Sequence, residues 1–591
     1  MIVPMKKVFV VSLTKESAHV LAALRDLGVV HLEHERIPQG THIDKLKDEV
    51  NTLSKTISLL GAESKNHRDI VFDQSPLEDW LGQANEFINL VNRIDQVKAE
   101  MTKRQVPIDA WEKWGDFDNL AIQLLAEKGI FIQLFEAGEN EIKNLPKGAV
   151  CEIVARAGKL LRFVVISREK INLPFNPVPL PQMSLGQMEE RQRQDKGFLE
   201  KAVIRIKETC RYLKSFEKIL AERISQLKFE EAMAGMGKDA TIVYLKGFCP
   251  AEKTLLLETT AQKEKWAVLI EDPSADDRVP TLLHNPKWVE LVKPVFSMMN
   301  IIPGYKELDI SLIFLFFFSV FFGILIGDAG YGFVFLGLTL FAHTKLKGKV
   351  EESTPFILIY VLSSCAIVWG LLTGTFFGTV LISKTLKPLV AWLTENKNVQ
   401  FLCFLIGATH LTIAHGWRLL MRIKTIFSAL AELGWIVIIW GAFFLANTMI
   451  IGAPLWGLDM NKSLGLVGAG AVLVITDILS RPKDGPVVGL VLTFFGCISA
   501  FTDVVSYIRL FAVGLAGVAV ADAFNEMALS IGFNHIVTGF LTVAILMIGH
   551  LFNIILGSMA IFVHGLRLNV LEFSSHLGME WSGIKYEPFR K

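Results

Sequence analysis

The sequence predicts a mixed fold class: cytosolic α/β lobes on a long antiparallel coiled-coil arm, followed by a multi-span α-helical membrane domain with two long tilted helices. Charge is unevenly distributed, because only 34 of the 119 charged side chains in this 591-residue chain lie in residues 301–591. Apolar residues in the first half repeat at helical spacing, and long apolar segments fill the second half. These observations exclude one uniform globular protein and predict two domains, residues 1–300 and 301–591.

The composition also excludes several classes of function. A net charge of +1 leaves no basic excess to neutralise phosphates, so nucleic acid is not an expected partner. None of the six cysteines forms a CxxC pair, and neither Gly235-Met236-Gly237-Lys238 nor Gly158-Lys159 is followed by the Ser or Thr of a phosphate-binding loop. We therefore expect no metal, no cofactor and no nucleotide site in this chain.

The polar half begins and ends with the same succession of elements. Residues 7–33 indicate strand, helix and strand, and residues 240–271 repeat that order, so the two units can pair into one α/β lobe. A strand-rich stretch at 129–170 predicts a second lobe. The apolar N-terminal run is too short for a signal peptide, which favours a cytosolic location for this half.

Between the two lobes, apolar residues follow steps of three and four. The spacing predicts helices from residue 43 to 60, from residue 76 onward, and from about 190 to 233, the last about 65 Å long if unbroken. Outgoing and returning helices with such seams form an antiparallel coiled coil. A compact helical domain is the alternative. An extended arm suits a strut better than a catalyst.

Eight apolar segments follow in the second half. They lie at 309–327, 329–343, 355–381, 399–420, 428–451, 463–480, 487–530 and 536–571. GDAGYG, from Gly327 to Gly332, interrupts the first two, which predicts a hairpin or a broken pair. The last two are long enough to exceed the hydrocarbon core of about 30 Å, so both must tilt or protrude.

Basic residues in the loops set the expected orientation. With the first half inside, the inner loops hold Lys345, Lys347, Lys349, Arg418, Arg422, Lys424, Arg481 and Lys483, and the outer loops hold Lys384, Lys387, Lys397 and Lys462. This excess favours cytosolic locations for the N-terminal domain and the C-terminus.

Two arginines lie inside the long apolar segments, Arg509 in SYIRLFAVGLAGVAV and Arg567 in AIFVHGLRLNVLEF. An arginine at a helix centre costs about 2.5–3.5 kcal/mol on insertion scales and cannot lose its proton. Each needs a carboxylate or a water-filled cavity. If both face outward, we expect the acid to come from another polypeptide. The alternatives are snorkelling for Arg567 and a buried structural ion pair for Arg509.

Other polar residues of these two segments could line water-filled paths to the arginines. They are Ser506, His564, Asn553, Asp503, Asp522, Glu526 and Glu572. His410 and His415 are expected to be packing or hydrogen-bonded histidines. Asp328, Asp477 and Glu432 lie near span ends, where solvation is the expectation.

At these residues the chain resembles the membrane stator subunit of rotary V/A-type ATPases, called subunit a or subunit I. SYIRLFAVGLAG is similar to the family segment SYxRLxALxLA, and HGLRLNVLEF to HxLRLxWVEF. FGILIGDAGYG, VPTLLHNPKWVELVKPVF and IGATHL match further family blocks in the same order. The length resembles the shorter prokaryotic form, which implies a multi-pass protein of the prokaryotic cell membrane.

The resemblance implies a mechanism and a set of partners. The membrane domain would contact a rotating proteolipid c/K ring through two offset aqueous half-channels, and Arg509 would match the essential arginine that attracts the deprotonated ring carboxylate and blocks leakage. Arg567 and His564 would match the second arginine and its neighbouring histidine. Further implied partners are peripheral-stalk subunits of E/G type, a central-stalk adaptor of d/C type and the lipid bilayer.

The chain departs from the family pattern at three positions. Gly517 replaces a histidine of some relatives, Gly557 a glutamate and Asn569 a histidine, so a half-channel here must use other groups. Two alternatives to an ion-translocating stator remain open: a stand-alone secondary ion transporter with a cytosolic regulatory domain, and a scaffold that only anchors partners. Proton and sodium are not distinguished, nor are pumping and synthesis.

Overall fold

The computed structural model describes residues 1–66, 72–73, 75–138, 149–157, 160–172, 177–239, 241–347, 350, 353–379, 387–452, 454–480 and 485–590. The chain forms two compact units. The membrane unit comprises Met1–Val8, Gly247–Thr259 and Leu269–Pro588, and the arm unit Phe9–Lys246, Thr260–Val268 and Phe589–Lys591. The domain boundary near residue 300 stays a prediction.

The two strand-helix-strand units predicted from the sequence share one sheet in the α/β lobe. Its sheet has the order β2-β8-β1-β9, with β7 paired to β8. Helix α1 ends where Gly28, at φ 61°, donates its backbone N–H to the Leu24 carbonyl. The elements are β1 (Met5–Leu13), α1 (Ser17–Leu27), β2 (His31–Glu33), β7 (Gly237–Asp239), β8 (Ile242–Pro250), α7 (Thr254–Glu264) and β9 (Ala267–Glu271).

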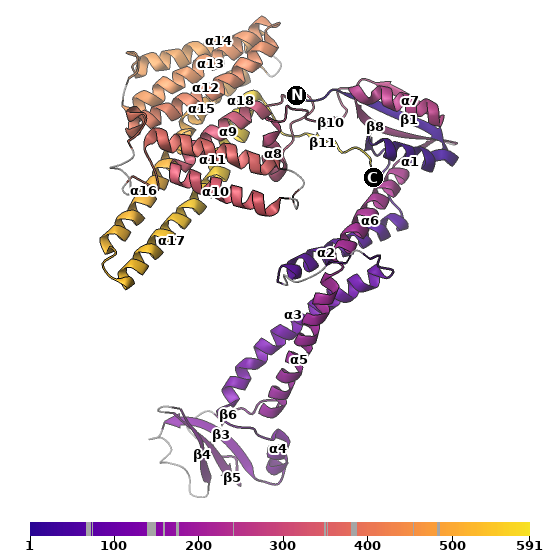
Figure 1. Ribbon diagram of the computed structural model, residues 1–591, viewed down its shortest axis with the longest axis vertical. Helices are drawn as coiled ribbons and strands as arrows, with labels where there is room; N and C mark the ends of the chain where they lie inside the picture. The colour runs from indigo at the N-terminus through magenta and orange to yellow at the C-terminus, as the bar shows by residue number, and fades with distance from the viewer. Residues whose placement is uncertain are drawn as a thin grey trace. The chain divides into compact units, whose positions relative to one another are not determined.

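The arm consists of two successive pairs of helices, as Figure 1 shows. Helix α6 (Leu213–Ala234) lies along α2 (Thr41–Asn66), and α5 (Leu185–Cys210) along α3 (Trp80–Trp111). Their buried seam contains Leu53, Leu60, Phe87, Ala202, Ile206 and Phe216. The predicted coiled-coil arm is therefore confirmed.

The expectation of one unbroken helix from about 190 to 233 is wrong, because α5 and α6 are separated at Arg211 and Tyr212. The carbonyl of Arg211 accepts the backbone N–H of Asp73 at 2.8 Å, and Ser215 Oγ donates to the Asp73 and Ser75 carbonyls. The Arg211 carbonyl bonds to the connection between α2 and α3 and not to a later residue of its own helix. The helix therefore ends there.

The second lobe is an antiparallel sheet of order β4-β5-β3-β6. In its register Phe135 lies opposite Phe163, and both are buried. The strands are β3 (Phe131–Gly138), β4 (Val150–Ala157), β5 (Leu160–Ser167) and β6 (Pro177–Val178), and α4 (Asn119–Glu127) precedes them. Residues 139–148, 158 and 159 of the predicted strand-rich stretch lie outside the described residues.

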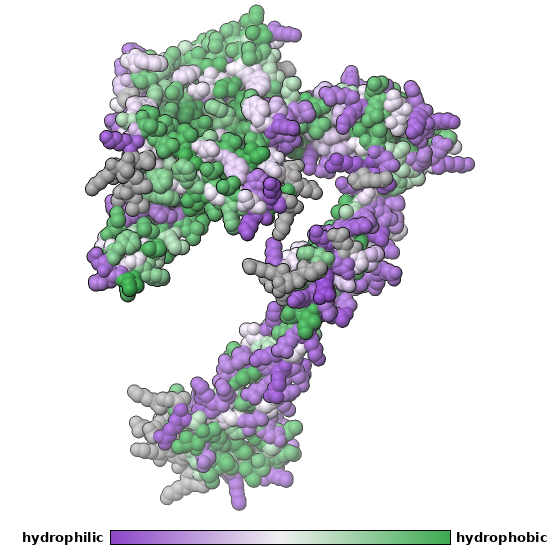
Figure 2. Space-filling view, in the orientation of Figure 1, coloured by the Kyte–Doolittle hydropathy of each residue, from purple (hydrophilic) through white to green (hydrophobic). Residues whose placement is uncertain are grey.

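The membrane unit is helical, and hydrophobic side chains cover its visible face while hydrophilic ones cover the arm helices (Figure 2). Among the described residues, six helices are long and apolar enough to span a membrane, or seven if one bent pair counts as a span. They are α11 (Thr354–Thr373), α12 (Asn396–Arg422), α13 (Ile426–Ala446, extended to Ile451), α14 (Met460–Ser480) and two long helices. The predicted multi-span helical domain is confirmed.

The bent pair is the interrupted segment that GDAGYG predicts. The chain bends by 118° between helix α9 (Ser311–Ile326) and helix α10 (Ala329–Leu346). Gly327 takes φ 67°, and Asp328 caps α10 by accepting from Tyr331 N at 3.1 Å. A leading helix α8 (Lys293–Met299) and the strand pair β10 (Pro280–Thr281) and β11 (Ile584–Lys585) complete this unit.

The two long helices run from Val487 to Ile531 and from Ile536 to Leu577. At 45 and 42 residues they correspond to about 67 and 63 Å. The first consists of α15 (Pro486–Ser506) and α16 (Ile508–Ile531). The second continues from α17 (Ile536–Ala560) through π-helical turns η7 (Ile561–Gly565) and η8 (Leu568–Phe573) into α18 (Ser574–Leu577), and α16 and α17 lie side by side (Figure 1).

Candidate functional site

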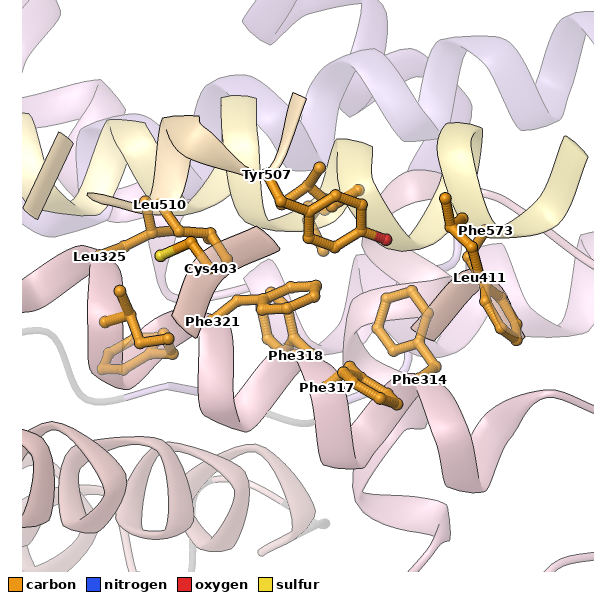
Figure 3. Packing of buried hydrophobic residues seen from close by; sticks show 14 of the residues in the cluster. Phe314, Phe317, Phe318, Phe321, Leu325, Cys403, Leu411, Tyr507, Leu510 and Phe573 are labelled. Carbon is orange, nitrogen blue, oxygen red and sulfur yellow. The ribbon is translucent and has the colours of Figure 1, made fainter. Parts of the chain in front are cut away.

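Tyr507, at the junction of α15 and α16, anchors the start of the helix that carries Arg509. Its side chain is fully buried among Phe318, Phe321 and Leu510 (Figure 3). The ring packs against Gly407 so closely that a Cβ at Gly407 would lie 2.6 Å from it. The Tyr507 hydroxyl also bonds to His410 Nδ1 at 2.8 Å. Two residues beyond this anchor, Arg509 has little freedom to move along the helix axis.

His410 is a packing and hydrogen-bonded histidine, as expected from its position in an apolar span. It is 0% exposed and its ring stacks between Phe317 and Phe573, at centroid distances of 3.8 and 4.3 Å. This stack fastens α12 to α9 and to the end of the second long helix. His410 thus fixes the framework on which the arginines are placed.

Glu572 binds both membrane arginines. Its Oε1 accepts from Arg509 Nη1 at 3.2 Å and lies 3.3 Å from Arg567 Nε. The carboxylate is 5% exposed, whereas the side chains of Arg509 and Arg567 are 26% and 53% exposed. The expectation that the acid comes from another polypeptide is therefore wrong for one carboxylate. One negative charge faces two positive charges, and one positive charge is left over.

The π-helical turn explains how Arg567 reaches Glu572. In a regular α-helix two residues five positions apart point about 140° away from each other. The segment Leu568–Phe573 is π-helical, and its i to i+5 bonding brings these positions to the same side. Such turns are often found at functional sites. A helical wheel drawn at 3.6 residues per turn therefore misses Glu572 as the partner.

A chain of four buried or half-buried side chains lies beside this centre. Glu432 Oε2 contacts His415 Nδ1 at 2.8 Å, and His415 Nε2 contacts His576 Nδ1 at 2.9 Å. His576 Nε2 then contacts Asp503 Oδ2 at 3.0 Å. The contacts join α13, α12, α18 and α15, which are far apart in sequence. His576 was not among the predicted site residues, because its contact with His415 depends on the packing of α18 against α12.

The expectation that Glu432 is solvated near a span end is wrong. Its side chain is 2% exposed, and its Oε1 accepts from Arg422 Nη1 at 2.9 Å and lies 3.0 Å from Arg418 Nη2. Arg418 also donates from Nη1 to the His576 carbonyl at 2.9 Å. Two guanidinium groups thus replace the water that a carboxylate would lose on burial.

Asp328 is likewise buried, at 1% exposure, which contradicts the expected solvation. It accepts backbone bonds from Tyr331, Phe377 and Gly378 at 3.1, 2.9 and 2.8 Å. Its carboxylate therefore holds the segment after α11 against the bend of the α9–α10 pair. Asp477, by contrast, is only partly buried and accepts from Ser428 Oγ at 3.0 Å.

The same segment after α11 is bound by α16. Asp522 accepts from the backbone N and the Oγ1 of Thr379, both at 2.6 Å, and Asn525 Nδ2 donates to the Phe377 carbonyl at 2.6 Å. Asp522 has a fixed position, whereas Glu526, one turn later, is exposed. Arg509 and Asp522 thus lie at two levels of the same helix.

Asn553 and His564 line a pocket of about 450 Å³ between α16, α17 and the α9–α10 pair. Asn553 Nδ2 donates to the Tyr331 hydroxyl at 3.0 Å and to the Gly517 carbonyl at 2.8 Å. His550 Nδ1 lies 2.8 Å from the same hydroxyl and is a further residue that the sequence did not single out. The small residues Ala512, Ala516 and Gly517 form the α16 wall of this pocket.

The structure thus brings Arg509, Arg567 and Glu572 together, and Asp503 with two histidines. Ser506 donates only to the Asp503 carbonyl, at 2.7 Å. Among the described residues no group of three or more histidine, cysteine or acidic side chains could hold a metal ion. The roles of the seven path-lining candidates stay predictions.

Comparison with known proteins places the whole chain in one family. It is 32% identical to V-type ATP synthase subunit I of Borreliella burgdorferi and 30% identical to V-type ATP synthase subunit I 1 of Treponema pallidum, over 100% of each chain. A-type ATP synthase subunit I of Methanocaldococcus jannaschii is 29% identical over 61% of this chain and 56% of its own length. No family model matches.

The full-length identities of 32% and 30% and the membrane-length helices lead to the same conclusion. The protein is an integral membrane protein. It belongs to the subunit I family of V/A-type ATP synthases and is a membrane subunit of a rotary ATPase.

Proposed function

We propose that this chain is the ion-translocating stator of its complex and that α16 and α17 face a rotating ring of proteolipid subunits. The arrangement of Arg509, Arg567 and Glu572 carries the proposal. One buried carboxylate neutralises one of the two guanidinium charges, so the site keeps a positive charge inside an apolar helix pair. A ring carboxylate passing this point would be attracted in its deprotonated form.

The accessibility of the two arginines supports this role. The Arg509 side chain is 26% exposed although its helix starts at the fully buried Tyr507, so the charge is presented at a surface. Ala512 and Ala516 follow on the same stripe and would let another helix come close. Large apolar side chains of the second long helix are exposed, among them Phe552, Met559 and Phe562. Such a face requires lipid or another membrane protein as its neighbour.

Two aqueous half-channels would connect this point to the two sides of the membrane. Asp503, Ser506 and Glu572 lie toward the α15 end of Arg509, and Asp522 and Glu526 lie toward the other end, so we assign them to opposite paths. Asn553 and His564 line the pocket beside α16. With a histidine and a glutamate of some relatives replaced by Gly517 and Gly557, these side chains and water would have to carry the ion.

The orientation follows from the loops. Lys345, Lys347, Arg418, Arg422 and Lys424 lie at the ends that we assign to the cytosol, and Lys387, Lys397 and Lys462 at the other ends. Lys349, Arg481, Lys483 and Lys384 lie outside the described residues. The N-terminal domain and the C-terminus would then be cytosolic.

The lobes and arm would connect the membrane unit to the rest of the complex. Helix pairs with a continuous buried seam transmit force better than a flexible linker, which suits a strut. We assign the lobes to contacts with peripheral-stalk subunits of E/G type and a central-stalk adaptor of d/C type. In this arrangement the arm stays still while the ring turns.

Reconstitution separates this function from a stand-alone transporter. The purified chain and the purified complex are placed in separate vesicles, and proton and sodium flux are recorded with and without ATP. We expect ATP-driven flux from the complex only, because the ring carboxylate is on another chain. Solute or ion flux from the chain alone would contradict the proposal and favour a secondary transporter.

A further inference from the structure

Glu432, His415, His576 and Asp503 form a hydrogen-bonded series of side chains, and the number of protons that this series needs can be counted. Three contacts of 2.8–3.0 Å link two carboxylates through two imidazoles. When both carboxylates are ionised they carry no proton, so each of the three hydrogen bonds takes its hydrogen from a ring nitrogen. Two neutral imidazoles hold only two hydrogens. The histidine pair must therefore hold one more.

This additional proton has three alternative positions. On His576 it gives an imidazolium that donates to both neighbours, and on His415 it gives the same pattern with the central bond reversed. On Asp503 it gives a neutral acid that donates to His576 Nε2, while both histidines are neutral. All three bonds persist in each case, so the proton can move along the chain without breaking a contact.

Only the Asp503 end of this hydrogen-bonded series can release the proton. At the other end Glu432 is paired with Arg418 and Arg422, and two guanidinium groups stabilise the ionised form of a carboxylate. His415, His576 and Glu432 have side chains that are 4%, 9% and 2% exposed, whereas Asp503 is 28% exposed. Asp503 precedes Arg509 by six residues, about 9 Å along the helix axis.

We propose that Asp503, His576 and His415 store one exchangeable proton and deliver it through Asp503 to the path beside Arg509. The inference rests on the proposed function. His576 Nε2 passes its proton to Asp503 Oδ2, Asp503 gives it to a ring carboxylate, and a hydronium ion that arrives on the Asp503 side returns one proton to the cluster.

The test uses the assembled complex in sodium-free vesicles, with ATP-driven proton uptake measured across pH 6–9. The variants are His576→Gln and His415→Gln, because glutamine keeps hydrogen bonds but cannot hold the additional proton. His343→Gln is the matched control, since His343 bonds to Tyr360 outside this cluster. We expect uptake to fall by about tenfold or more in the two test variants, with an altered pH profile, and to stay unchanged in the control.

The other outcomes of this assay bear separately on the proton store and on the proposed function. Wild-type uptake by assembled His576→Gln and His415→Gln complexes at every pH would overturn the proton store. If Arg509→Ala still abolishes uptake in the same assay, the proposed function stands; if Arg509→Ala also pumps, the proposed function fails. A wild-type complex that takes up sodium and no protons would also overturn the proton store.

A second measurement covers variants that do not assemble. Nitrogen-15 NMR of the wild-type complex with labelled histidine reports the protonation of each ring. We expect an imidazolium that persists at pH 8, where free histidine with a pKa of about 6.5 is neutral. A spectrum that contains only neutral histidines at pH 8, together with an infrared spectrum in which Asp503 is ionised, would overturn the proposal.

Discussion

Arg509 of α16 and Glu572 of the π-helical turn η8 are joined by a 3.2 Å hydrogen bond between Nη1 and Oε1. The bond connects the two long helices at the level where each carries an arginine. Because Arg567 uses the same oxygen, the three side chains act as one charged group with a net positive charge. The charge is built into the chain before any partner approaches.

Replacing Glu572 by Gln should leave both guanidinium groups without a counter-ion. We expect ATP-driven ion uptake to fall by about tenfold or more, and the stability of the membrane unit to fall by about 1–3 kcal/mol, less than for a fully buried pair because both arginines are partly exposed. Glu580→Gln, at an exposed position nearby, is the control. Equal uptake in both variants would show that the shared carboxylate has no role.

Gly407→Ala should displace Tyr507 and with it the start of α16. The added Cβ would lie 2.6 Å from the Tyr507 ring, which is fully buried and cannot move away without cost. Overpacking of this kind costs about 1–3 kcal/mol. Gly416→Ala in the same helix has open space around its Cβ and should be neutral. Thermal unfolding of the purified complex compares the two, and a similar midpoint in both would contradict this packing.

Asp522→Asn and Glu526→Gln test which acid on this part of α16 matters. Asp522 holds Thr379 by two bonds of 2.6 Å, so losing its charge should cost about 1.5–3 kcal/mol and reduce ion uptake. Glu526 is exposed, and we expect its replacement to leave stability unchanged. Melting curves and uptake are measured together. A loss of uptake in Glu526→Gln at full stability would make Glu526 the path-lining acid.

The thiols of Cys210 and Cys249 should resist alkylation in the folded protein. Burial raises the pKa of each to about 11 from an ordinary 9.0, so at pH 8 about a hundredfold less thiolate is present. Reactivity should rise with pH toward 11. Mass spectrometry after iodoacetamide treatment measures it, with the urea-unfolded chain as control. Rapid labelling of Cys249 at pH 8 in the folded protein would contradict its burial.

Much of the architecture could be predicted because it depends on local pattern. Helical spacing is a property of each segment, so the arm and the apolar spans followed from the sequence, and Gly327-Asp328 marked the bend of α9 and α10. The break at Arg211 could not be predicted, because it depends on a backbone bond from Asp73 of another connection.

The site divides in the same way. Arg509 and Arg567 could be found because a charge inside an apolar span needs an explanation wherever the chain folds. Their partner Glu572 could not, because its approach depends on a π-helical turn. The burial of Glu432 and Asp328 depends on arginines and backbone groups brought by other helices. His576 reaches His415 only through tertiary packing.

The most direct test of the stator mechanism is ATP-driven ion uptake by vesicles containing the complex with Arg509→Ala. The complex should still assemble, because Tyr507 and Gly514 retain the packing of α16 against α12 and α9. We expect ATP-driven uptake to be abolished, since Glu572 then balances Arg567 and the site keeps no net positive charge to attract the ring carboxylate. Uptake at the wild-type rate by the assembled Arg509→Ala complex would contradict the account.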